Sequence, residues 1–63
     1  MNEFIKGRLR IRFKILRRLS KYEMQDELKV DKEFLYGYIA GLYDDREISF
    51  DQRNKLNKAI KEI

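Results

Sequence analysis

The chain contains no proline and only three glycines among its 63 residues, so little in it can interrupt a helix. Cysteine and histidine are also absent, which removes disulfides, thiolate metal sites and the commonest general base. A domain of this length buries only a small core and forms no more than one folded unit. We therefore expect one all-helical domain over residues 1–63, with no metal site and no cofactor.

Several residues carry signals for the start of a helix. Ser20 and Glu23 have the spacing of a capping box, in which each side chain satisfies a backbone N–H beside the other. Ser49 and Gln52 repeat this spacing, and Asp31 is a good N-cap residue. Together with a first helix, these signals predict a compact four-helix domain with helices over about 3–18, 21–29, 32–40 and 50–62.

The two middle helices are short and are separated by only two or three residues, as in a helix-turn-helix. Gly41 follows the second of them, where a left-handed C-cap is easiest for glycine. The sequence thus predicts a tight corner near residues 29–31.

The first segment has a second interpretation. Apolar and basic residues alternate over 9–15, which is typical of a half-buried strand. We favour a helix, because a lone strand would leave its backbone unpaired unless another chain supplied a partner. The alternative is a β-strand over 8–15, which would give a ribbon-helix-helix-like dimer or an α+β Cro-like domain.

The order of these signals resembles the Cro/lambda-repressor-like helix-turn-helix family, also called the XRE family, over about residues 13–60. Leu19-Ser20 opens the pattern, and Lys29 stands where the family usually has a turn glycine. The later positions of the pattern are filled by Met24, Leu28, Val30-Asp31, Leu35, Tyr38, Gly41 and the segment 55–60. The resemblance implies a small cytoplasmic, sequence-specific DNA-binding transcriptional regulator of the phage-repressor type.

The resemblance also implies that helix 32–40 lies in the major groove and reads base edges of double-stranded DNA. The residues at its base-reading positions are Lys32, Glu33, Tyr36 and Gly37. Candidates for phosphate contacts are the basic residues Arg17, Arg18, Lys21, Arg46 and Arg53. The loop after the recognition helix contains Asp44-Asp45, whose carboxylates would repel a phosphate strand.

Charge is distributed unevenly along the chain. Residues 1–21 hold eight basic residues and one acidic residue, whereas residues 22–63 hold seven basic and ten acidic residues. Such asymmetry suggests an acidic partner: nucleic acid, an anionic membrane or an acidic protein. Four of these residues are expected to form a solvated face too far along the first helix to reach DNA: Arg8, Arg10, Arg12 and Lys14.

The first helix has more apolar residues than one core stripe needs. Ile11 and Ile15 fall beside the stripe, so we expect them to be exposed or to meet another chain, in a homodimer or with a protein partner. The alternative function is therefore a protein-binding module or inhibitor that docks through this helix. An enzyme with a small-molecule substrate is not expected, and neither a signal peptide nor a membrane span is evident.

Overall fold

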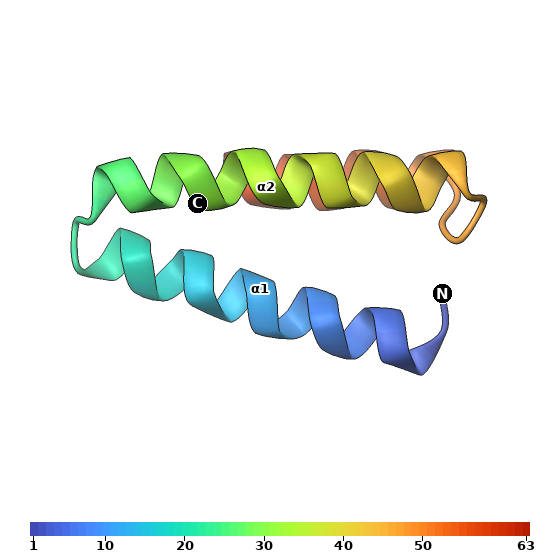
Figure 1. The fold of residues 1–63 in the computed structure, drawn as a ribbon, viewed down its shortest axis with the longest axis horizontal. Helices are drawn as coiled ribbons and strands as arrows, with labels where there is room; N and C mark the ends of the chain where they lie inside the picture. Colours follow the sequence, from blue (N-terminus) through green and yellow to red (C-terminus); the bar gives the residue numbers. More distant parts are fainter.

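The computed structural model describes all 63 residues as three helices: α1 (Glu3–Lys21), α2 (Gln25–Asp44) and α3 (Phe50–Lys61). Figure 1 shows α1 and α2 side by side in opposite directions, with α3 folded back along α2. The all-helical prediction is confirmed. The strand alternative over 8–15 is wrong, because these residues lie inside α1 and their backbone groups bond within the helix. No helix is both long enough and apolar enough to cross a membrane.

The first helix forms much as its sequence predicts. The N–H of Ile5 donates to the side-chain oxygen of Asn2 at 2.8 Å, which caps the helix start. The buried residues of α1 recur every three or four positions and form a single stripe: Ile5, Leu9, Phe13 and Leu16. Outside this stripe Leu19 is half-buried, and Phe4, Ile11 and Ile15 are exposed. Exposure of Ile11 and Ile15 is one of the two outcomes that the sequence predicts.

The prediction of four helices is wrong, because residues 25–44 form one unbroken helix. Asp31 and Gly41, expected to begin and end a short helix, both lie inside α2. A corner at 29–31 would break several i→i−4 hydrogen bonds at a place with no glycine or proline. One continuous rod also keeps all the buried residues of α2 on one face: Leu28, Leu35, Ile39 and Leu42.

The predicted capping box at Ser20 is wrong as well, because Ser20 lies in the last turn of α1. Its hydroxyl donates instead to the backbone carbonyl of Ile63, at 3.5 Å. α1 ends in a Schellman motif: the N–H of Met24 donates to the carbonyl of Leu19, and that of Glu23 to the carbonyl of Ser20. Met24 itself is exposed.

α2 ends in the same way. The N–H of Glu47 donates to the carbonyl of Leu42, and that of Arg46 to the carbonyl of Tyr43. The left-handed position of the two motifs is held by Glu23 (φ 57°) and Arg46 (φ 60°). Both residues carry a Cβ where glycine is favoured, at a cost of roughly 1 kcal/mol each.

Replacing Glu23 or Arg46 by glycine should therefore stabilise the domain. We expect a gain of about 0.5 kcal/mol at each position, because the strain removed exceeds the entropy that glycine adds to the unfolded chain. Urea unfolding followed by circular dichroism measures this gain. Gly41→Ala offers a contrast, since it lies within α2 with nothing near its would-be Cβ and should gain through helix propensity instead. Destabilisation by Glu23→Gly would contradict the assigned motif.

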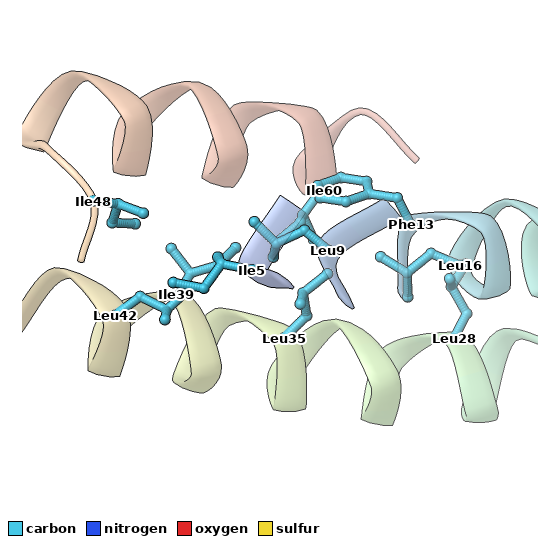
Figure 2. Close-up of a cluster of buried hydrophobic side chains, with 10 residues drawn as sticks. All are labelled: Ile5, Leu9, Phe13, Leu16, Leu28, Leu35, Ile39, Leu42, Ile48 and Ile60. Atoms are coloured by element: carbon cyan, nitrogen blue, oxygen red, sulfur yellow. The ribbon is translucent and has the colours of Figure 1, made fainter. Parts of the chain in front are cut away.

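The third helix begins where its sequence predicts. Ser49 and Gln52 form the expected capping box, with backbone-to-side-chain hydrogen bonds of 2.8 Å and 3.1 Å. Ile60 is buried, while Leu56 and Ile63 pack at the edge of the core. Figure 2 shows the complete core of ten apolar side chains, nine from the three helices and one, Ile48, from the loop before α3.

Candidate nucleic-acid interface

The four predicted base-reading residues lie in the middle of α2 rather than at the start of a separate helix. Lys32 and Tyr36 are half-buried, and Glu33 is exposed; the three line one shallow depression together with Gln25, Leu28 and Lys29. Gly37 is exposed and does not line this depression. Because no corner precedes them, these residues do not project from an edge of the domain.

The predicted phosphate contacts divide between the two ends of the molecule. Arg17, Arg18 and Lys21 are exposed in the last turns of α1. Arg46 lies in the loop that joins α2 to α3, at the opposite end (Figure 1). A 20-residue helix such as α2 is about 30 Å long, so the two groups cannot form one compact site.

Arg53 is placed by aromatic contacts. Its guanidinium carbon lies 4.5 Å from the ring centre of Tyr43 and 4.8 Å from that of Phe50. The two rings meet edge to face, with their centres 6.3 Å apart. This half-buried arginine therefore helps to pack α3 against α2. A phosphate contact by Arg53 stays a prediction.

The start of α2 does not offer an anion site either. The first turn of α2 carries Asp26 and Glu27, whose negative charges already interact with the positive end of the helix dipole. A phosphate placed there would be repelled by both carboxylates. The N-terminus of α2 is therefore acidic and unsuited to phosphate binding.

The structure instead brings together a row of basic residues on α1, spaced three or four positions apart and all exposed: Arg10, Lys14, Arg17 and Lys21. We call this row the basic stripe. Residues at this spacing lie on the same helix face. None of the four has an acidic partner, since the ion pairs of the molecule are Glu3–Lys6 at 3.6 Å and Asp51–Lys55 at 3.0 Å.

Sequence reasoning identified Arg17 and Lys21 but assigned Arg10 and Lys14 to an inert solvated face. The spacing 10, 14, 17, 21 was the available signal. Two other arginines of α1 lie over aromatic rings of α2. The guanidinium carbon of Arg12 is 5.0 Å from the ring centre of Phe34, and that of Arg8 is 5.6 Å from the ring centre of Tyr38. These two therefore cover the α2 side of the helix, and the basic stripe occupies another side.

The comparisons with known proteins identify no relative: no family model, curated protein or solved structure matches this chain.

Proposed function

We propose that this protein binds double-stranded DNA through the basic stripe of α1. The proposal is carried by one observation: four exposed basic side chains follow each other along one helix face without an acidic partner. Binding of this kind is dominated by contacts to phosphates, which release condensed counterions from the duplex. The proposed mode differs from the recognition-helix mode implied by the sequence resemblance.

The charges of the stripe support a polyanionic partner. Like charges three or four residues apart destabilise a helix by about 0.2–0.5 kcal/mol per pair, so the unbound stripe opposes folding slightly. Attraction between these side chains and a row of phosphates would offset their mutual repulsion. Most acidic residues lie on α2 and in the loop that follows, and the one acidic residue of α1, Glu3, pairs with Lys6 instead.

The length of the stripe suits a duplex. α1 rises about 1.5 Å per residue, so Arg10 and Lys21 lie about 16 Å apart along the helix axis. This distance corresponds to about five base pairs at 3.4 Å each. Four side chains over that length can contact several successive phosphates of one strand.

The proposed binding has little sequence preference. The basic stripe would contact phosphates, which carry no sequence information. On α2, Glu33 lines the depression that holds Lys32 and Tyr36, whereas Asp26, Glu27 and Asp31 line another depression of the same helix. Base reading by Lys32, Glu33, Tyr36 and Gly37 and repressor-type regulation stay predictions from the sequence, and they would require α2 to approach the groove as one long helix.

The salt dependence of DNA binding tests the proposal. Fluorescence anisotropy with a labelled duplex of mixed sequence, titrated between 50 and 200 mM salt, should show log K falling against log salt with a slope of about −3.6 for four phosphate contacts. Affinity should then fall roughly 100-fold across this range and differ little between unrelated duplexes. A slope near zero, or no binding at the lowest salt, would overturn it.

A second candidate function is a protein-binding module that docks through α1. It is favoured by the exposure of Ile11 (61%) and Ile15 (37%), which are large apolar side chains on a solvent-facing side of the helix. Under this function Ile11→Asp abolishes capture of the partner, whereas neutralising the basic stripe leaves capture largely intact. The two functions thus depend on different residues of the same helix.

A further inference from the structure

Much of the apolar surface of this protein remains uncovered. Ten side chains are buried, while eight large apolar side chains are exposed. Seven of the eight belong to α1, α2 or the turn between them: Phe4, Ile11, Ile15, Tyr22, Met24, Val30 and Phe34. The eighth, Phe50, lies at the start of α3, so most of the uncovered apolar side chains belong to α1, α2 and their turn.

Two groups of these side chains flank the same junction between α1 and α2. Ile11 and Ile15 are one turn apart on α1, and Val30 and Phe34 are one turn apart on α2. The guanidinium of Arg12, three residues before Ile15, lies over the ring of Phe34, which places both groups on one side of the bundle. We call this surface the α1–α2 face.

The two halves of the α1–α2 face carry opposite charges. On α1, a shallow depression is lined by Ile11 and Ile15 with Lys14 and Arg18 beside them. On α2, a second shallow depression is lined by Val30, with three carboxylates around it: Asp26, Glu27 and Asp31. None of these charged side chains forms an ion pair within the molecule.

We propose that the α1–α2 face binds a second copy of this chain. In a twofold-symmetric pair, each copy presents the same surface, so the depression on α1 of one copy meets the depression on α2 of its partner, and the reverse contact follows by symmetry. Apolar side chains would then meet at the centre, with basic groups opposite acidic groups at the rim. Each molecule carries both the basic and the acidic half, so in a pair of copies each half meets its complement.

The size of the surface is adequate. A standard interface buries about 800 Å² on each partner. That area is about one sixth of the 4927 Å² that the chain exposes. The long axis of the molecule measures 34 Å and the next 18 Å, so one broad side of the bundle can supply it. The resulting pair would bury Ile11, Ile15, Val30 and Phe34 in the middle of a four-helix arrangement of two α1 and two α2 helices.

Sedimentation equilibrium of the full chain tests the proposal. The wild-type protein should change with concentration from the 7.8 kDa monomer to a species of twice that mass. Ile11→Asp should prevent this association, and the control Ala59→Asp, at an exposed position of α3, should not. A wild-type chain that stays monomeric at millimolar concentration overturns the proposal.

A charge exchange between copies identifies the contact itself. Lys14→Glu with Arg18→Glu makes the α1 half acidic, and Asp26→Lys with Glu27→Lys makes the α2 half basic. Each double variant alone should associate at least roughly tenfold more weakly than wild type, because like charges then oppose each other at both contacts. An equimolar mixture of the two should regain association, since the mixed pair places opposite charges at both contacts.

Failure of the mixture to associate while both variants remain helical by circular dichroism would overturn the assigned pairing. No arm of this experiment contains DNA, so a monomeric result leaves the proposed DNA binding untouched. Loss of DNA binding in the salt titration would likewise leave the proposed pair intact.

Discussion

Replacing Arg10, Lys14 and Arg17 by glutamine should weaken binding to duplex DNA by about two orders of magnitude at 100 mM salt. Each phosphate contact contributes about 0.9 to the salt slope, so the slope should flatten from about −3.6 to about −0.9. All three side chains are exposed and unpaired, so the substitutions should leave the fold unchanged. Anisotropy titrations over a salt series measure both quantities.

The chain offers a control with the same loss of charge. Lys55, Lys58 and Lys61 are exposed on α3, and their replacement by glutamine also removes three positive charges. Because salt screens charges more than about 10 Å apart, this control should alter affinity only a few-fold. Equal weakening by the two triple variants would mean that net charge, and not the basic stripe, governs binding.

Lys32→Pro should destabilise the domain strongly. Lys32 is the eighth residue of α2 and lies in the helix interior. Proline there removes a backbone hydrogen bond and its ring clashes with the preceding turn, which costs about 3 kcal/mol or more. A domain of this size has a total stability of roughly 3–9 kcal/mol. Circular dichroism and urea unfolding should therefore show a largely unfolded chain or a strongly shifted midpoint.

The same substitution distinguishes one long helix from two short ones. If a helix began at Asp31, residue 32 would be its first helical position, where proline is well tolerated. Glu3→Pro provides the control, because Glu3 is the first residue of α1 and follows Asn2 in an extended conformation (ψ 163°). We expect it to change stability by no more than about 0.5 kcal/mol. A stable Lys32→Pro variant would indicate that a separate helix begins at Asp31, and it would support the interpretation of helix 32–40 as a recognition helix.

Local signals predicted some of the fold and misplaced the rest, for a physical reason. The Ser49–Gln52 box and the core stripe of α1 needed no information from elsewhere in the chain, and both are present. Ser20 and Asp31 carry equally good capping signals that the fold does not use. Ser20 bonds to the carbonyl of Ile63, and Asp31 lies in a rod held by its own apolar stripe. The packing of this stripe against α1 and α3 favours one continuous helix, and a short window of sequence does not contain those contacts.

The surroundings of the predicted phosphate contacts also depend on long-range packing. The sequence predicts phosphate contacts by Arg17 and Lys21, and the structure places both residues, exposed, near the end of α1. The sequence does not predict such contacts by Arg10 and Lys14, because the predicted DNA contact depends on a corner between two short helices, which is absent from α2. The sequence also predicts a phosphate contact by Arg53, and it does not reveal that this side chain packs on two aromatic rings. Tyr43 belongs to α2 and Phe50 to α3, so their approach to Arg53 depends on the packing of two helices.

The position of α2 between its neighbours has a consequence for how the molecule opens. α2 packs along both α1 and α3, whereas the two outer helices approach each other much less. The molecule thus consists of two helical hairpins that share one arm. Local opening needs to break only the contacts of the element that leaves, so α1 can swing about the turn at Tyr22–Met24 while the α2–α3 hairpin stays assembled.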